Sequence, residues 1–168
     1  STSNNLTGIE NLPSNTAENL FWSGRYLART LITARYIRMV LNQMSNSEFN
    51  KRDSDSESLH ILYKSITHLT SIFPGFTGKN EDKALEDPLK EIAIVLFDKT
   101  KVGSLAHALS SFNNSYYSLR NLWSKDMWRV YDTLQKIWHD FDEEDHQNEK
   151  KIIKLLDTVI TKLIAFIG

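Results

Sequence analysis

The sequence predicts an all-α fold, a compact helical bundle of about six helices with one long N-terminal helix. The chain of 168 residues contains only 6 Gly and 3 Pro, so few positions favour turns. Between them, apolar side chains recur every three to four positions, which is the period of an amphipathic helix and not of a strand. With 40% hydrophobic residues, the chain can bury one core of ordinary size.

The N-terminal segment, residues 1–14, is rich in Asn and Ser and predicts a linker or arm ahead of a helical domain over residues 15–168. The first helix of that domain begins at Asn15, a cap residue that is followed three positions later by Glu18. It extends over about 28 residues, which corresponds to a length of about 40 Å. Its apolar face is marked by Leu20, Leu27, Leu31, Ala34 and Leu41.

Residues 45–58 carry Asn, Asp, Ser, Lys and Arg with little to bury, so the sequence predicts a mobile connection there. A second helix is expected over residues 58–73, because Pro74 and Gly75 then stop it. The stretch that follows, up to Asp87, has the glycine and charge content of an irregular loop with one short turn.

A third helix begins at Asp87 and Pro88, in the favoured order of cap and proline. Its segment over residues 92–97 is apolar on every side, so we expect this helix at the centre of the bundle. The Gly-Ser pair at residues 103–104 opens a fourth helix that ends near Trp123.

A fifth helix is expected over residues 125–141, with Ser124 as its cap. An acidic turn at residues 142–145 separates it from a sixth helix over residues 148–167. The sixth helix has lysines on one side and Ile, Leu and Val on the other, as an amphipathic helix on a core requires.

The charge balance and the cysteine count limit the expected partners and the expected cellular compartment. Twenty basic and 21 acidic residues give a net charge of −1, so we expect neither nucleic acid nor a membrane surface as partner. The absence of cysteine removes disulfides and thiolate sites and fits a reducing compartment, so we expect a cytoplasmic protein. The longest apolar run, residues 92–97, is too short to span a bilayer. A start at Ser1 without Met suggests processing or excision from a longer chain.

The chain lacks the common local motifs of catalysis, and we therefore expect no catalytic residues, no cofactor and no bound metal. A phosphate-cradling Gly-rich loop, a GxSxG elbow and an HExxH pair are all missing. Two Glu-x-x-His stretches, residues 57–60 and 143–146, have the spacing of a dinuclear carboxylate site. Both lie at predicted helix ends beside solvated loops, so we interpret them as solvated charges.

Aromatic and basic side chains crowd the first helix. Arginine guanidinium groups suit carboxylates or phosphates, which favours a ligand or a partner on this surface. The same side chains can instead pair with acids of neighbouring helices and cover the core, and the sequence leaves both interpretations open. The residues concerned are Phe21, Trp22, Arg25, Tyr26, Arg29, Arg35 and Arg38.

Residues 16–29, TAENLFWSGRYLAR, resemble the opening of the alpha-E family, helical bacterial domains named for a Glu-Arg motif. The family pattern there is close to A-[DE]-N-L-[YF]-W-x-G-R-Y-x-E-R-A-E-x-x-A-R. Residues 98–109 resemble the family's D-x-x-N-P-S-S-I-x-x-x-L stretch. Residues 120–128 resemble its R-x-x-[IL]-S-x-E-x-W ending, with Asp126 standing for the Glu. The resemblance covers most of the chain from Leu12 to Trp138.

The chain departs from the family pattern at its acids. Ala28 stands at the Glu of the Glu-Arg pair, Leu31 stands at the next acid, and residues 112–115 replace A-R-E-N with FNNS. Ala and Leu neither bind metal nor transfer protons, so the glutamates' acid–base or metal chemistry cannot operate here. The resemblance implies a divergent member that keeps the scaffold and a docking surface.

The resemblance also implies a pathway context. Family members generally contain two related halves, of which this chain resembles the first. They occur fused after, or encoded beside, a circularly permuted ATP-grasp ligase-like domain, with transglutaminase-like proteins nearby, which implies peptide or amide-bond formation. A half-fold can expose apolar surface that a second copy would cover, so a homodimer is a candidate assembly.

We therefore hypothesise a non-enzymatic accessory domain that docks to an ATP-grasp ligase-like domain, either fused or separate. The alternative is a ligase or transferase component that binds an acidic peptide or a phosphate through an arginine cluster, Arg25, Arg29, Arg35 and Arg120. The candidate ligand- or partner-binding residues are Trp22, Arg25, Tyr26, Arg29, Arg35, Arg120, Asp126 and Trp128.

Overall fold

The computed structural model describes the backbone of residues 13–50 and 53–168, and the side chains of these residues outside 48–55. The described residues form seven α-helices and three short 3₁₀ turns with no strand, which confirms the all-α prediction. The helix beyond the expected six is α4 (Glu81–Glu86), a short helix inside the stretch predicted as a loop with one turn. Most of the predicted N-terminal arm, residues 1–12, lies outside the described part.

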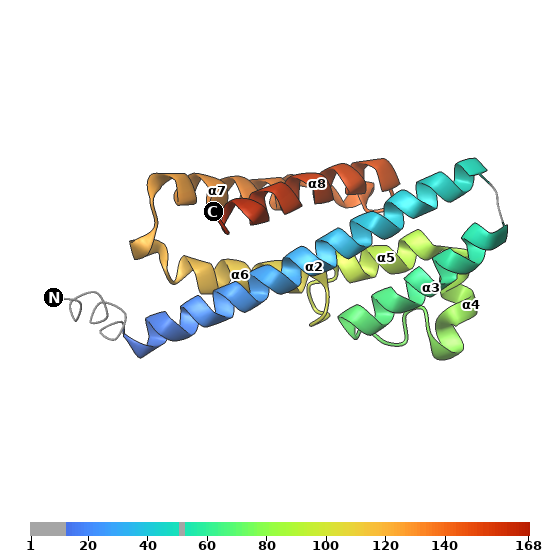
Figure 1. Ribbon diagram of the computed structural model, residues 1–168, viewed down its shortest axis with the longest axis horizontal. Helices are drawn as coiled ribbons and strands as arrows, with labels where there is room; N and C mark the ends of the chain where they lie inside the picture. Colours follow the sequence, from blue (N-terminus) through green and yellow to red (C-terminus); the bar gives the residue numbers. More distant parts are fainter. Residues whose placement is uncertain (1–12, 51–52) are drawn as a thin grey trace.

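The long N-terminal helix is confirmed as α2 (Ser14–Asn50), which runs along the length of the molecule (Figure 1). It begins one residue before the predicted start, because the carbonyl of Pro13 accepts the N–H groups of Thr16 and Ala17 at 2.9 and 3.1 Å. Asn15 therefore lies in the first turn and does not cap the helix. At 37 residues, α2 is about 55 Å long.

The connection predicted at residues 45–58 is wrong for residues 45–50 and 53–58, which are helical, and its residues 51–52 lie outside the described part. The helix α2 continues to Asn50, and α3 (Asp53–Thr70) begins only three residues later. No Gly lies between Gly24 and Gly75 and no Pro between Pro13 and Pro74, so residues 45–50 and 53–58 contain neither of the strong helix breakers. A polar composition removes a buried face, but it does not end a helix.

Two helices cover the buried side of α2 and run back along it, α6 (Leu105–Tyr117) and α8 (Glu149–Ala165) (Figure 1). The helix α7 (Lys125–Asp140) lies beside α8 and completes the bundle. The side chains that are fully buried between these helices include Ala34, Ile37, Leu41, Leu105, Leu109, Leu134, Ile152 and Leu156.

No described helix has both the length and the apolar content that crossing a bilayer requires.

Polar side chains cap the N-terminal ends of α6, α7 and α8. Ser124 caps α7, as predicted, and Ser104 and Asn148, where the fourth and sixth helices were expected to start, cap α6 and α8. The helix α6 ends at Tyr117, earlier than expected, and a 3₁₀ turn, η2 (Arg120–Leu122), leads to α7. A second turn, η3 (Glu143–Asp145), occupies the predicted acidic turn.

The most apolar helix, α5 (Pro88–Phe97), is not the centre of the bundle. It starts as predicted, with the Asp87 carboxylate accepting the backbone N–H of Lys90. It packs against α4 and the start of α6, and Ile92, Val95 and Leu96 are its buried residues. The central place belongs to α2, because only a helix of that length contacts α3, α6 and α8 together.

The helix α3 ends at Thr70, and the loop after it folds back onto the helix. The Thr67 hydroxyl accepts the N–H of Phe76 at 2.9 Å, and the Phe76 ring stacks on Tyr63 with centroids 4.9 Å apart. The loop leads through η1 (Gly78–Asn80) into α4. A side chain at position 103 would collide with this end of α3, since a Cβ there would lie 1.7 Å from the Thr70 carbonyl oxygen.

We predict that Gly103→Ala destabilises the protein by about 2 kcal/mol or more, because the contact is with backbone that no rotamer change can move. Gly24→Ala is the matched control. Its Cβ would meet nothing within 4 Å in α2, so we expect a gain of about 0.5–1 kcal/mol from helix propensity. Urea unfolding measures both. Equal effects of the two substitutions would contradict the close contact between the loop and α3.

Candidate functional site

The predicted aromatic and basic residues near the start of α2 form a contiguous surface, which we name the α2 ladder: Phe21, Trp22, Arg25, Tyr26 and Arg29. The Trp22 and Tyr26 rings stack with centroids 5.8 Å apart, and Phe21 meets Trp22 edge-on at 5.4 Å. The Arg25 guanidinium carbon lies 5.7 Å from the centre of the Trp22 ring, a cation–π distance. Residues three and four apart on a helix are neighbours, so the sequence spacing alone produces this stack.

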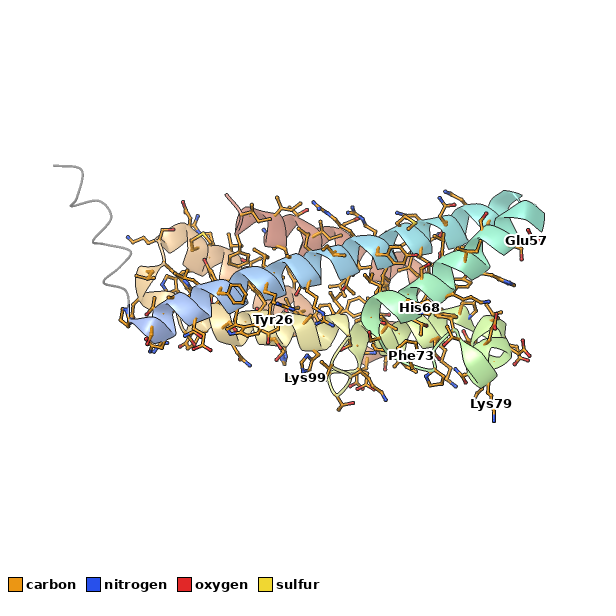
Figure 2. All side chains as sticks on the ribbon, turned by 60° about the horizontal axis from the view of Figure 1, so that its bottom comes forward. Tyr26, Glu57, His68, Phe73, Lys79 and Lys99 are labelled. Carbon is orange, nitrogen blue, oxygen red and sulfur yellow. The ribbon has the colours of Figure 1, made fainter. Side chains whose placement is uncertain are left out.

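The ladder is accessible. Phe21 exposes 62% of its surface and Trp22 exposes 36%, and both arginines are exposed. Tyr26 is half-buried and packs against the core, which anchors the stack (Figure 2 labels Tyr26 beside α6). Aromatic and arginine side chains held at such a surface are the types that dominate binding energy at protein interfaces.

No carboxylate of the described residues lies within ion-pair distance of Arg25, Arg29 or Arg35. Arg38 differs, because it forms an ion pair with Asp157 of α8 at 3.0 Å. The interpretation in which all helix-one arginines pair with neighbouring acids therefore holds for Arg38 alone within the described structure. The other three guanidinium groups keep their donors available to a partner.

Arg35 does not belong to the ladder. A helix turns about 100° and rises about 1.5 Å per residue, so Arg29 lies about 40° round the axis from Arg25, whereas Arg35 lies about 80° from Arg25, about 120° from Arg29 and about 9 Å beyond Arg29 along the axis. Position 28, where the family pattern has its Glu, is exposed beside the ladder and holds Ala28. Position 31 holds Leu31, which is 7% exposed and belongs to the core.

The remaining predicted residues, Arg120, Asp126 and Trp128, lie at the turn from α6 to α7. Arg120 covers the Tyr117 ring at 4.6 Å and donates a hydrogen bond to its carbonyl, so this arginine already has local partners. Asp126 lies 3.8 Å from Arg129 in an exposed pair. Such pairs contribute little to stability.

Trp128 belongs to an aromatic cluster that the sequence did not predict, which we name the corner cluster: Tyr116, Tyr117, Trp123, Trp128 and Tyr131. Trp123 is its centre, with ring centroids 4.6 Å from both Tyr116 and Trp128. The local signal is the number of aromatic residues on both sides of the turn after α6. The α2 ladder and this cluster lie at the same end of the molecule (Figure 1), but no ring–ring or cation–π contact between described residues joins them.

The pKa values of two cluster tyrosines are raised. Burial raises the pKa of Tyr116, and burial raises that of Tyr131 with smaller contributions from Tyr117 and Asp132. The packed rings exclude water, which disfavours the phenolate. The corner cluster is therefore a stabilising feature of the turn and not a proton-transfer site at neutral pH.

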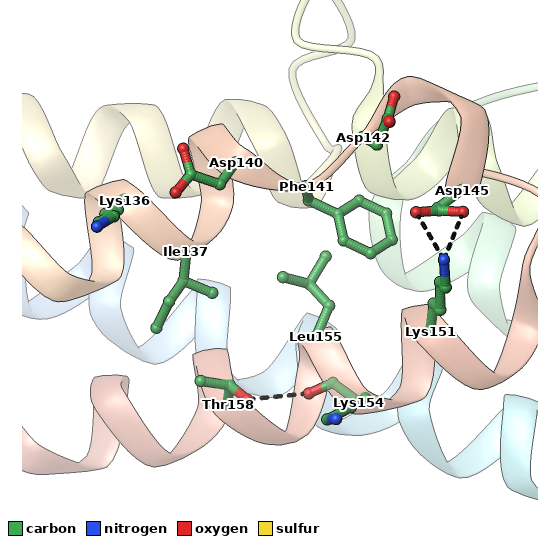
Figure 3. A pocket seen from close by; sticks show the side chains of 10 residues that line it. All are labelled: Lys136, Ile137, Asp140, Phe141, Asp142, Asp145, Lys151, Lys154, Leu155 and Thr158. Atoms are coloured by element: carbon green, nitrogen blue, oxygen red, sulfur yellow. Dashed lines mark hydrogen bonds and ion pairs between the residues drawn. The ribbon is translucent and has the colours of Figure 1, made fainter.

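An open pocket of about 500 Å³ lies between α7 and α8 near η3 (Figure 3). Ile137, Phe141 and Leu155 form its apolar floor, and three Lys and three Asp side chains also line it. Lys151 is already paired with Asp145 at 3.2 Å. A lining of balanced charge gives no preference for a ligand of either sign.

The two Glu-x-x-His stretches do not come together as a metal centre. Within the described residues, no group of three or more His, Asp and Glu side chains lies close enough to hold an ion. Glu57 and His60 are exposed near the start of α3, where Figure 2 shows Glu57 at the end of the molecule away from the α2 ladder.

The fold and the site define an all-α bundle domain whose recognisable motif lies exposed on its longest helix. A sequence model of the Alpha-E family, described as a predicted alpha-helical domain with a conserved ER motif, matches residues 12–168. The chain therefore belongs to the Alpha-E family. Comparisons with curated proteins and with solved structures find no match.

We predict that stability falls as the pH rises above about 10. The unfolded chain ionises its tyrosines near pH 10, whereas the folded protein holds Tyr116 and Tyr131 protonated to higher pH. The unfolded state then loses protons first, so the free energy of unfolding decreases with rising pH. Urea unfolding of Tyr131→Phe should show a smaller decrease than the parent protein. An identical pH slope would contradict the burial argument.

Proposed function

We propose that this domain is a non-enzymatic docking module that binds its partner protein through the α2 ladder. The single observation behind the proposal is that Trp22 and Arg25 form an exposed stack whose cation has no acidic partner among the described residues. An unpaired, preorganised guanidinium beside an exposed indole is complementary to a carboxylate next to an apolar side chain. The partner surface is therefore acidic with an apolar centre.

The partner that we propose is an ATP-grasp ligase-like domain, fused or separate, in a system that forms peptide or amide bonds and is associated with transglutaminase-like proteins. The resemblance at residues 16–29 supports this context, since such domains accompany members of the family. Residues 98–109 and 120–128 give weaker support of the same kind.

The chemistry of the ladder supports docking over catalysis. Trp, Phe and Arg side chains supply neither a nucleophile nor a proton donor that titrates near neutral pH. The positions at which the family pattern has acids hold Ala28 and Leu31, which cannot take these roles. The α2 ladder supplies aromatic stacking area and positive charge, which are properties suited to binding a partner.

The alternative is a ligase or transferase component that binds an acidic peptide or a phosphate through Arg25, Arg29, Arg35 and Arg120. The unpaired state of the three α2 arginines favours it. Their placement does not, because Arg35 points to another side of α2 and Arg120 lies over Tyr117 at the corner cluster. A homodimer through the exposed apolar side chains of α2 is a further candidate, which light scattering tests directly.

We predict that Arg25→Glu combined with Arg29→Glu weakens binding of the ATP-grasp ligase-like protein encoded with or fused to this domain by at least about tenfold, because the substitutions place like charges together. Biolayer interferometry with the purified proteins measures the affinity. Trp22→Ala should give a loss of similar size, as expected for an aromatic side chain at the centre of an interface.

Arg35→Glu is the matched control, with the same charge change on another side of the same helix. We expect its affinity to stay within about twofold of the parent. Unchanged binding of the double variant would reject docking through the ladder. An equal loss in Arg35→Glu would favour the alternative, in which a broad arginine surface binds an anionic ligand.

A further inference from the structure

We propose that a cavity between α6 and α7 is a binding site for a compact organic anion that carries an amide-like edge, an N–H beside a C=O. The cavity has a volume of about 420 Å³ and lies away from the α2 ladder. Volumes of this size hold small ligands in proteins. Six lining residues give it its chemistry: Lys99, Asn113, Tyr131, Gln135, Trp138 and His139.

Two side-chain amides of the lining have no partner. Oδ1 of Asn113 and Nε2 of Gln135 are buried without a hydrogen bond. Buried polar atoms in native proteins are nearly always bonded, because leaving them unpaired costs free energy. Asn113 on α6 supplies an unpaired acceptor and Gln135 on α7 an unpaired donor, and both residues line the same cavity. These two atoms therefore favour a ligand that forms a hydrogen bond with each of them.

The two amides are complementary to an edge that carries both a donor and an acceptor. Both atoms are inaccessible in the free protein, and the terminal torsions of Asn and Gln are broad, so rotation of each amide about this torsion would turn the buried atom toward the cavity. Asn113 then accepts a hydrogen bond from the ligand N–H, while Gln135 donates one to the ligand C=O. An extended peptide residue, whose own N–H and C=O point to the same side, presents this edge, and so do nucleobases, whereas a simple carboxylate or phosphate does not.

The charge of the lining selects an anion. No Asp or Glu lines the cavity, and Lys99 supplies a fixed positive charge from the turn after α5 (Figure 2). Three acids, Asp98, Asp132 and Asp140, adjoin lining residues in the sequence without lining the cavity themselves, and the Asp98 carboxylate accepts the N–H and the hydroxyl of Thr100 at 3.0 and 2.6 Å. His139 adds a further group that can donate to an anion.

The aromatic lining supplies an apolar face for the body of the ligand. Trp138 packs against Phe97 with ring centroids 5.7 Å apart, and both rings line the cavity together with Tyr131. Flat or apolar groups gain from contact with such rings. Two kinds of compound combine an amide-like edge with a negative charge: a short peptide with a free carboxylate, and a nucleobase joined to a phosphate.

Isothermal titration calorimetry with two probes distinguishes these sources. N-acetyl-dialanine represents the peptide carboxylate, and uridine 5′-monophosphate represents the nucleotide. Acetate and inorganic phosphate are the charge-only controls. We expect one of the two probes to bind saturably with one site per chain, and neither control ion to bind comparably. The probe that binds identifies the source of the ligand.

The variants Asn113→Leu and Gln135→Met test the amides, and each should weaken binding of that probe by about tenfold. Each removes an unpaired buried polar atom, so the thermal midpoint should stay unchanged or rise. Lys99→Ala should also weaken binding. Lys101→Ala, an exposed lysine of the same turn that does not line the cavity, is its matched control and should not.

Several results would overturn the proposal. One is the absence of saturable binding by either probe at millimolar concentration. Another is equal binding of inorganic phosphate, which would reduce the site to a point of positive charge. Binding that the amide substitutions leave unchanged, or a thermal midpoint that both of them lower, would show that Asn113 and Gln135 are structural and do not contact a ligand.

Discussion

The packing of α2 against α6 and α8 is the interaction on which the rest of the structure depends. Ala34, Ile37 and Leu41 are fully buried on one side of α2, where α6 and α8 run antiparallel to it. Each large side chain buried there contributes about 1.5–3 kcal/mol. The helix α6 also contacts α5, and α8 also contacts α7. Loss of the packing between α2 and these two helices would therefore detach every other helix from α2 except α3, which contacts α2 directly.

This constraint also explains why the motif surface is exposed. Burial of one side of α2 leaves its opposite side to solvent, and the ladder residues Arg25 and Arg29 lie there because helical spacing repeats them on one side. The arginines of α2 differ in their ion pairing. Arg38 is close enough to α8 to meet Asp157, whereas the ladder arginines face outward. The exposure of the α2 ladder thus follows from the placement of the helix itself.

Local signals in the sequence predicted the helix starts at Asp87, Ser104 and Ser124, since a cap depends on residues a few positions apart. The long α2 was predicted in kind but not in extent, because helix formation at residues 45–50 depends on the absence of breakers more than on composition. The ladder followed from spacing along one helix. The placement of Asn113 and Gln135 in the wall of one cavity could not be predicted, because it requires the register between α6 and α7.

Native-state hydrogen exchange tests most directly the claim that α2 organises the fold. Amides from Thr30 to Leu41 should exchange only through global unfolding, together with those of the buried faces of α6 and α8. Amides of α7, whose only fully buried residue is Leu134, and of the short α4 should exchange through smaller openings. Exchange of the α2 amides at a lower free energy than those of α7 would contradict the account.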